Sequence, residues 1–449
     1  MIRLLLALLL LPAAFPCQAG EPLARAEVEA FLDGLLPAAM AQGGIPGAVV
    51  VVVHAGETLV AKGYGLADTQ AQRPVDAERT LFRPGSISKL YVATAVLQHA
   101  EAGRLDLDAD IQRYLDFPIP ERPDGPITLR HLLTHTAGFE ERYRNLFLPE
   151  GEALPPLREE LARHVPRRIY AAGAMPAYSN YGSALAGHIV ASAAGMPFEA
   201  YVEHFLLEPI GAQRTSFRQP LPPALAADVA TGYPHRGASA RPFETVGLPP
   251  AGALSTTGAD LARFMIAHLD EGGPLLKPQT AALMQQTASR PLPPLAGMAL
   301  GYFVLREEKP RILEHGGATG VARASLWLFP ETRTGIAILT NSPGKSEAAV
   351  RLFQALLQGF LARWHPEANA MPPVTAGSAA SAVAGRYLPT RRSGRGIARA
   401  FGFSQAVSIT ASSDGALRTS RPTAPDGEPM IFRPVADGLW QDAESGRRL

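Results

Sequence analysis

The sequence predicts an α+β fold in which one antiparallel sheet is interrupted by a long helical insertion. Three observations support this prediction. A valine-rich hairpin lies near the N-terminus, the apolar runs typical of strands return only after about residue 300, and the stretch between them is mostly helical in its periodicity, with Pro/Gly-rich connections. The early hairpin and the late strands would then share one sheet, with a crevice between the sheet edge and the helical part.

The elements before the insertion are a helix and a hairpin. Residues 26–36 have apolar side chains at helical spacing and are expected to form a helix that Pro37 ends. The valine run 47–54 and a second strand at 58–62 predict a buried β-hairpin. Gly63-Tyr64-Gly65 resembles the start of a dinucleotide fingerprint, but no βαβ crossover follows, so it is interpreted as a turn.

The elements after the insertion are strands and a closing helix. The expected strands are 300–305, 311–315, 324–329 and 335–340, and an amphipathic helix is expected over 347–361. Residues 366–383 are rich in Pro, Ala, Ser and Thr and are expected to form a linker. Residues 384–449 predict a small β module with Asp-Gly turns at 414–415 and 437–438. A core of that size would be marginal alone, so either the module packs on the main domain or a further segment is needed.

The N-terminus predicts a cleaved secretory signal. Arg3 precedes an apolar run over 4–14 that is too short to span a bilayer, and a small residue, Ala19, suits cleavage before Gly20. The only cysteine, Cys17, falls inside this leader, and plain secretion is favoured over a lipoprotein cleavage site. We therefore expect a signal peptide over 1–19, a main domain over 20–365, and a secreted or periplasmic protein without disulfides.

The composition excludes several classes of function. Of the 449 residues, 47% are hydrophobic and 18% are charged, which is ordinary for a globular protein, and the net charge of +1 gives no reason to expect nucleic acid as a partner. No run after the leader reaches transmembrane length, so no stable membrane span is expected in the mature chain. Nucleophile-elbow, P-loop and metal-binding motifs are missing from the sequence, and neither a metal nor a cofactor is expected.

The strongest candidate for chemistry is a serine–lysine pair at the start of the insertion. Ser86 and Lys89 are three residues apart, so a helix beginning at Ser86 would place both on one face. Apolar residues recur at helical spacing from Ile87 to Leu97, and Gly103 is a natural C-terminal stop. A desolvated lysine has a lowered pKa and can take the proton of the serine nucleophile.

A structural interpretation of the same pair stays open at this point. Ser86 is a suitable helix N-cap, and Lys89 would then be a solvated residue of the first turn. A second pair with this spacing, Ser342 and Lys345, encloses Pro-Gly and is interpreted as a turn. Partners elsewhere in the chain must decide between the two interpretations.

A tyrosine and an asparagine supply the next two groups. Tyr178 lies two residues before Asn180, ahead of an apolar helical run, so both can project into one cleft. The phenol can take and return a proton, and the amide can bond both a substrate carbonyl and the lysine. A second Tyr-x-Asn, at 143–145, lies in a charged setting that is more typical of a solvated loop, so Tyr178 is favoured.

The sequence 314–320 supplies the third side of the expected cleft. A strand ending in His315-Gly-Gly lets the backbone approach a ligand closely, because Gly317 has no side chain. The amides of Ala318 and Ser86 are the expected oxyanion hole. Alone, this motif favours the structural interpretation, a tight turn between strands with His315 as an ordinary polar residue.

These three motifs in this order resemble the β-lactamase-related serine hydrolases. That family groups class C β-lactamases, secreted D,D-carboxypeptidases, D-amino-acid peptidases and several esterases. The resemblance covers about residues 25–365 and includes the supporting stretches 63–68, 127–138 and 250–256. It implies the penicillin-recognising fold, an antiparallel sheet flanked by helices with an all-helical region.

The resemblance also implies roles for single residues. Ser86 is the acylated nucleophile, Lys89 its proton acceptor and Tyr178 the base for deacylation, whereas His131 and His135 belong to a structural stretch. Where penicillin-interacting relatives often have Lys-Thr-Gly, this chain has His-Gly-Gly. Because histidine is mostly neutral at pH 7, an efficient β-lactamase is disfavoured, while a D,D-peptidase, an esterase or an amidase remains open.

The sequence thus predicts a secreted serine hydrolase that cleaves an ester or amide through an acyl-Ser86 intermediate. Its expected partner is a small-molecule or peptide substrate, cell-wall peptides included. One alternative is a non-turnover receptor that uses the same fold to bind β-lactams or cell-wall peptides. Another is that the C-terminal β module is the functional part and binds envelope components.

Overall fold

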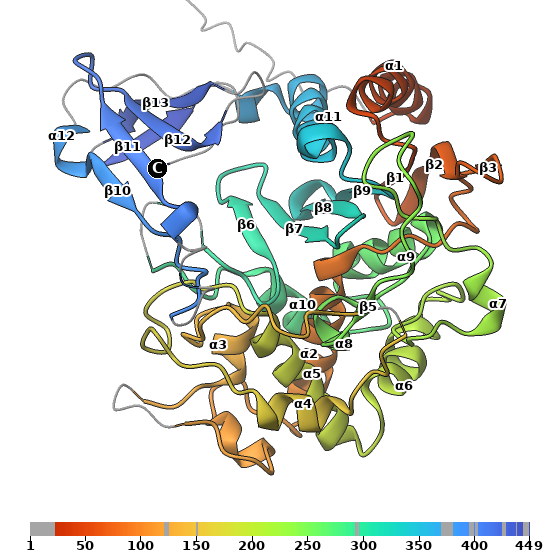
Figure 1. Ribbon diagram of the computed structural model, residues 1–449, viewed down its shortest axis with the longest axis vertical. Helices are drawn as coiled ribbons and strands as arrows, with labels where there is room; N and C mark the ends of the chain where they lie inside the picture. The colour runs from red at the N-terminus through yellow and green to blue at the C-terminus, as the bar shows by residue number, and fades with distance from the viewer. Residues whose placement is uncertain are drawn as a thin grey trace, which may run out of the picture.

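The computed structural model describes residues 23–120, 125–149, 151–291, 295, 297–369, 380–394, 399, 403–423, 428–436, 438–442 and 449. The expected signal peptide with Cys17, most of the expected linker and Asp437 of the second Asp-Gly turn lie outside these residues. The described chain forms a central sheet flanked by helices, a helical region below it, and a separate small sheet near the C-terminus (Figure 1).

The central sheet unites the early hairpin with the late strands, as predicted. Its seven strands follow the order β3-β2-β1-β9-β8-β7-β6, and each named pairing is antiparallel. Their bounds are β1 Gly47–His54, β2 Glu57–Asp68, β3 Arg73–Pro74, β6 Phe303–Arg306, β7 Ile312–Ala318, β8 Arg323–Phe329 and β9 Thr334–Thr340.

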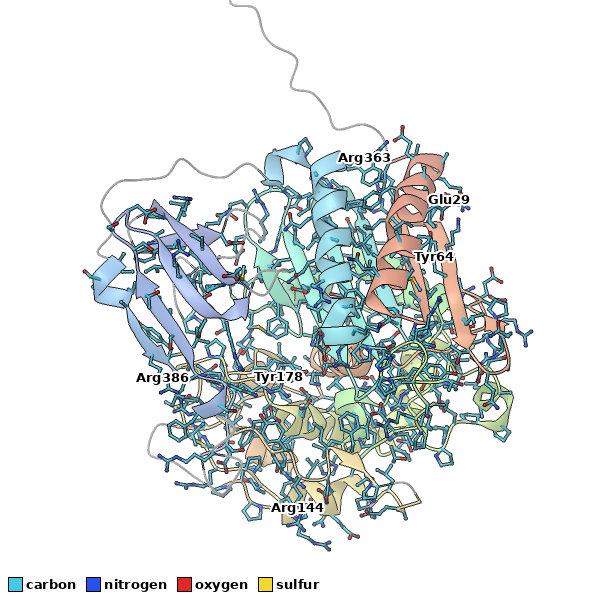
Figure 2. All side chains as sticks on the ribbon, turned by 45° about the horizontal axis from the view of Figure 1, so that its top comes forward. Glu29, Tyr64, Arg144, Tyr178, Arg363 and Arg386 are labelled. Atoms are coloured by element: carbon cyan, nitrogen blue, oxygen red, sulfur yellow. The ribbon has the colours of Figure 1, made fainter. Side chains whose placement is uncertain are left out.

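The valine run of β1 is continuous because both faces of the sheet are buried. Val49, Val51 and Val53 pack into the cluster on the side of the helical region, while Val50 and Val52 face a second cluster. The second cluster is closed by α1 (Arg25–Gly43) and α11 (Ala348–Trp364), which lie side by side over the sheet (Figures 1 and 2). A strand with two apolar faces needs no polar alternation.

Two predictions for this part of the chain are wrong. α1 does not end at Pro37 but continues through it to Gly43. Leu36 and Met40 both pack against the sheet, and Gly44 adopts the left-handed conformation of a C-cap. Residues 63–65 form no turn and belong to β2. A Cβ at Gly63 would lie 2.1 Å from the Val75 carbonyl oxygen, so the glycine permits the chain to cross closely there.

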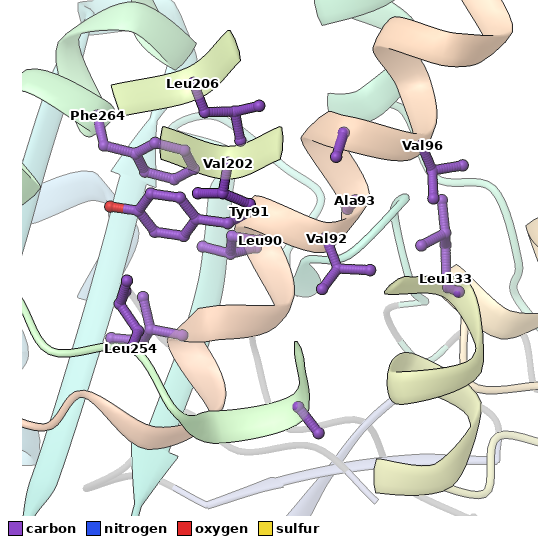
Figure 3. Packing of buried hydrophobic residues seen from close by; sticks show 14 of the residues in the cluster. Leu90, Tyr91, Val92, Ala93, Val96, Leu133, Val202, Leu206, Leu254 and Phe264 are labelled. Carbon is purple, nitrogen blue, oxygen red and sulfur yellow. The ribbon is translucent and has the colours of Figure 1, made fainter. Parts of the chain in front are cut away.

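The helical region follows β3 and carries the first two catalytic motifs. Its helices are α2 Ser88–Glu101, α3 Leu129–Leu133, α4 Leu157–Arg163, α5 Asn180–Ala194, α6 Phe198–Val202, α7 Pro223–Ala226, α8 Pro249–Gly252, α9 Gly258–Leu269 and α10 Pro278–Gln285, with a two-stranded pair of β4 Phe147–Leu148 and β5 Thr245–Val246. α2 is buried on nearly all sides, and Tyr91 stacks on Phe264 at 3.9 Å between ring centroids (Figure 3). A helix so enclosed holds its first turn rigidly.

The C-terminal module is a five-stranded antiparallel sheet. It contains α12 Ala380–Val383 and the strands β10 Gly385–Tyr387, β11 Val407–Ala411, β12 Leu417–Thr423, β13 Pro429–Ala436 and β14 Leu439–Asp442. Its own buried apolar cluster is small, with Phe432 and Trp440 as the largest members. Among the described residues, no helix is long and apolar enough to cross a membrane.

Candidate active site

Ser86 lies in a tight turn that leads into α2. Residues Gly85–Ile87 form one 3₁₀ turn, and the α-helix begins at Ser88, two residues later than predicted. Gly85 has φ +55°, and a Cβ there would lie 2.7 Å from the Ala318 carbonyl oxygen, so this position requires glycine for both reasons. Within the described residues, the Ser86 hydroxyl forms no capping hydrogen bond. The interpretation of Ser86 as an N-cap is therefore wrong.

Lys89 is buried beside the serine rather than solvated. Its side chain amine Nζ lies 3.0 Å from Ser86 Oγ, and the residue is 3% exposed. Burial lowers the pKa of the Lys89 ammonium well below its ordinary value, and the nearby cation of Arg391 lowers it further, while Glu141 opposes both effects. Burial thereby shifts Lys89 toward the neutral amine, the form that can accept a proton.

Three contacts hold the Lys89 side-chain nitrogen in place beside the serine. Nζ donates to Asn180 Oδ1 at 2.9 Å and to the Ala251 carbonyl at 2.5 Å, and both of these oxygens only accept. A neutral amine has two N–H donors and one lone pair. Nζ also donates to Ser86 Oγ at 3.0 Å, and once Lys89 is a neutral amine the same contact can carry the hydroxyl proton to its lone pair.

Tyr178 forms the other side of the serine. Lys89 Nζ lies 4.9 Å from the centroid of its ring, and the Arg391 guanidinium lies 4.7 Å from the same centroid. Burial raises the pKa of the Tyr178 phenol, while a hydrogen bond with Ser86 and the charge of Arg391 lower it. Burial prevails, so the free protein holds a neutral phenol that can donate a proton. Figure 2 shows Tyr178 in the middle of the molecule.

Asn180 links the lysine to a buried carboxylate that the sequence analysis did not identify. Its amide oxygen accepts from Lys89, as expected, and its Nδ2 donates to Glu141 Oε1 at 3.4 Å. As the first residue of α5, Asn180 is fixed by the Ser179 cap, whose hydroxyl accepts from the Gly182 amide at 3.0 Å. The structure thus uses both ends of the amide inside the protein.

The third motif lies on β7 against the serine turn. A Cβ at Gly317 would lie 1.8 Å from the Pro84 carbonyl oxygen and 3.1 Å from the Ser86 amide nitrogen. This approach places Gly317 beside Ser86 and Ala318 beside Gly85, so the two amides predicted to form the oxyanion hole lie on adjacent segments. The strand does not end at His315 but continues through both glycines to Ala318.

His315 is buried and neutral. It is 1% exposed, and its Nδ1 lies 2.7 Å from the Gly316 carbonyl oxygen. Burial lowers the pKa of His315 to about 3, with a further contribution from the charge of Lys89. His315 therefore offers no cation to a substrate at neutral pH.

The two histidines left out of the site have structural contacts. The ring of His131 closes a capping box on α3, accepting from the Thr128 amide at 3.2 Å. His135 lies closer to the chemistry, with its ring centroid 4.3 Å from that of Tyr178 and its Nδ1 3.3 Å from the Ser179 amide. His135 thus positions the Tyr178 loop, as befits a residue in a structural stretch.

The sequence analysis missed a charged pair at the edge of the site. Glu141 is buried, with 2% exposed, and its Oε2 accepts from Arg391 Nε at 2.5 Å. The expectation of a solvated loop at 140–143 is wrong for both glutamates, although Tyr143 is exposed. A charged tripeptide gives no sign that a distant arginine will cover it.

A cleft of about 1210 Å³ opens onto these groups. Its lining includes Ser86, Tyr178, Asn180, Gly317, Ala318, Phe303, Arg391, Met430 and Asp442. The last three of these come from the region after the expected linker, so the C-terminal module forms part of the wall. In the part of the chain that the structure describes, no group of three His, Cys, Asp or Glu side chains is arranged to hold a metal ion.

The structure brings the predicted Ser86, Lys89 and Tyr178 together beside one cleft. The sequence matches the family model named Beta-lactamase over residues 32–360, and the chain belongs to that family. It is a serine hydrolase of the β-lactamase, D,D-peptidase and esterase type.

Two of the relatives are named as different kinds of hydrolase, an esterase and a β-lactamase. The chain is 34% identical over 237 residues to Esterase EstB of Burkholderia gladioli, covering 50% of this chain and 58% of the esterase. It is 31% identical over 273 residues to a β-lactamase of Lysobacter lactamgenus, covering 60% of this chain and 68% of that enzyme. The first match therefore spans little more than half of the esterase's length.

Solved structures agree on the fold. The octameric penicillin-binding protein homologue from Pyrococcus abyssi superposes with a TM-score of 0.64 at 22% identity, over 94% of this chain and 99% of its own. A class C β-lactamase from Rhodobacter sphaeroides gives 0.60 at 23% identity, over 74% of this chain and 99% of its own. These structures confirm the predicted penicillin-recognising fold.

Proposed function

We propose that the protein is a secreted hydrolase that cleaves small esters and D-amino-acid amides through an acyl-Ser86 intermediate. The observation that carries this proposal is the buried Lys89 side chain, whose Nζ lies 3.0 Å from Ser86 Oγ and is held there by contacts with Asn180 Oδ1 and the Ala251 carbonyl. A helix cap or a solvated lysine does not need this arrangement. A general base beside a nucleophile does.

Acylation begins when Ser86 Oγ attacks the acyl carbon and its proton passes to Lys89 Nζ. The carbonyl oxygen becomes an oxyanion between the amides of Ser86 and Ala318. When the tetrahedral intermediate collapses, the bond to the leaving group breaks, and the leaving group takes a proton from the Tyr178 hydroxyl. Lys89 returns a proton to Tyr178, so the pair is restored.

Deacylation repeats these steps with water. A water molecule attacks the acyl carbon, gives its proton to the Tyr178–Lys89 pair, and releases the acid as Ser86 recovers its hydroxyl proton. The neutral phenol acts as a relay here, and the neutral amine is the proton reservoir. The resemblance alone implied Tyr178 as the base; the pKa directions of the two groups favour their joint action.

The substrate class rests on the relatives and on His315. The relatives include an esterase and a β-lactamase, and the neutral His315 offers no permanent charge at the third motif. We therefore place esters and D-amino-acid amides ahead of β-lactams.

Secretion is proposed on the leader at 1–19 and is tested by sequencing the N-terminus of the protein recovered from the periplasm; an intact Met1 there would contradict it.

Stopped-flow hydrolysis of p-nitrophenyl acetate tests the proposal. A burst of p-nitrophenolate approaching one equivalent per protein is expected, followed by slower turnover, and Ser86→Ala should abolish both phases. Normal turnover by Ser86→Ala would contradict the proposal. A stable, stoichiometric label with fluorescent penicillin but no turnover of any ester or peptide would favour the receptor instead.

A further inference from the structure

The site as described so far lacks a cation that faces the substrate. Lys89 is enclosed by its three contacts and is favoured as a neutral amine, and His315 is buried. Of the cations that line the cleft in the described part of the chain, Arg391 is the one that lies over the ring of Tyr178. Arg391 comes from the C-terminal module, 305 residues after the nucleophile in the sequence.

Arg391 is placed so that part of its guanidinium stays available. Its Nε donates to Glu141 Oε2, and its plane lies over the ring of Tyr178. Among the described residues, neither Nη atom has a hydrogen-bond partner, and the side chain is 44% exposed. The end-on edge formed by the two Nη atoms is therefore free to bind an anion beside Tyr178.

The backbone around Arg391 is anchored independently of its side chain. The Glu141 amide donates to the Arg392 carbonyl at 2.9 Å, and the Ser393 hydroxyl donates to the Glu141 carbonyl at 2.6 Å. The Gly394 amide donates to Glu140 Oε2 at 2.7 Å. These bonds fix the segment 391–394 on the loop at 140–141, so the guanidinium is held beside the site rather than on a free tail.

We propose that Arg391 is a specificity-determining residue that binds a carboxylate of the substrate on the far side of the acyl carbon from Lys89. The C-terminal module thereby contributes directly to the active site. This inference rests on the proposed function and adds to it a substrate class, esters and amides with a carboxylate near the scissile bond. Glu141 pairs with Nε of Arg391 and leaves the Nη edge uncovered.

Two chromogenic esters test the inference: p-nitrophenyl hydrogen terephthalate, which carries a carboxylate that the rigid ring keeps away from its own ester, and p-nitrophenyl methyl terephthalate, which is neutral. The measured quantity is the ratio of their kcat/KM values. Because a hydrogen-bonded ion pair discriminates strongly, Arg391→Gln should lower this ratio about 10- to 100-fold, mainly through KM for the charged ester. Taking a ratio cancels any effect of Arg391 on the chemistry itself.

Two further variants sharpen the test. Arg391→Lys keeps the charge but not the fork, and it should restore part of the ratio. Arg392→Gln is the matched control, since that side chain lies over the Tyr170 ring and outside the cleft; it should leave the ratio unchanged. Activity of Arg391→Gln on the neutral ester shows that the variant is folded.

The failures are distinguishable. If Ser86→Ala still hydrolyses both esters, the proposed function fails, and this inference with it. If hydrolysis requires Ser86 but Arg391→Gln changes the ratio less than twofold, or lowers both esters equally, the inference alone is overturned.

Discussion

At the scale of single residues, the proposed general base is a buried lysine, Lys89, rather than a histidine. Lys89 is held among oxygen acceptors, and its pKa falls because the ammonium is desolvated. Tyr178 shares the same pocket and is favoured as a phenol. Burial thereby shifts both groups toward the neutral forms that proton transfer from a serine uses.

Removing the amine should therefore remove the activity. Lys89→Met keeps the length and apolar stem of the side chain, and we expect kcat to fall at least about 1000-fold in p-nitrophenyl acetate hydrolysis, since general-base steps contribute 10²–10⁴-fold. Lys277→Met, at an exposed lysine that is 67% accessible, is the control and should behave as the wild type. A Lys89→Met protein with more than a tenth of normal kcat would contradict the role of the base.

The pH profile should carry the signature of Lys89. As the pH falls, the amine is protonated and kcat/KM declines with the slope of one proton. Arg391 lowers the pKa of Lys89, so Arg391→Gln should move this acid limb to higher pH, while the neighbouring carboxylate of Glu141 acts in the opposite sense. The profile of the neutral ester between pH 4 and 9 measures the shift; a limb that moves down in pH would refute this electrostatic assignment.

At the scale of elements, the serine turn and β7 fit together through glycine. Gly85 and Gly317 bring two backbones into contact, and a side chain at either position would overlap backbone atoms. β7 is in turn held in the sheet between β6 and β8. The oxyanion hole thus depends on the packing of a strand against a helix start.

Neighbouring glycines provide a matched pair of variants. A Cβ at Gly317 would meet the Pro84 carbonyl at 1.8 Å, whereas one at Gly316 would have nothing closer than 3.9 Å. We expect Gly317→Ala to lose activity at least about 100-fold. Its free energy of unfolding, measured by urea titration, should fall by about 1–3 kcal/mol, as in other overpacked sites. Gly316→Ala should keep most of its activity and stability. Equal losses in the two variants would exclude the close approach of Gly317 to Pro84 as the cause.

The sequence predicts most of these elements, and its errors have physical causes. Hairpin, late strands and closing helix follow from apolar periodicity, which reports burial directly. Pro37 does not end α1 because the contacts of Leu36 and Met40 outweigh one lost hydrogen bond. Arg391 was missed because its position depends on contacts with the 140–141 loop, and no local pattern encodes a partner 250 residues away.

At the scale of the whole molecule, buried neutral histidines connect the layers. His268 of α9 lies 2.6 Å from the Tyr302 hydroxyl through Nδ1 and 3.1 Å from the Thr94 hydroxyl of α2 through Nε2. Burial lowers the pKa of His268 to about 3. These histidines therefore make the fold sensitive to acid.

The sign of this effect follows from linkage. His268 has a folded pKa of about 3, below its unfolded value of about 6.5, so its contribution is complete above pH 6.5 and is lost as the pH falls toward 3. Between these pH values, the free energy of unfolding of His268→Asn should depend on pH less steeply than that of the wild type, with a slope smaller by about 1.4 kcal/mol per pH unit. Urea titrations from pH 6 to 4.5 measure this, with exposed His204→Asn as the control for removing a histidine; parallel slopes for wild type and His268→Asn would contradict it.

The central claim is the covalent intermediate on Ser86, and mass spectrometry tests it most directly. The protein is quenched in acid during turnover of a slowly deacylated aryl ester, digested, and searched for the acyl group. We predict one acyl group, on the peptide that contains Ser86, and its loss in Ser86→Ala. Acylation of a different residue, or continued turnover by Ser86→Ala without any adduct, would contradict the account.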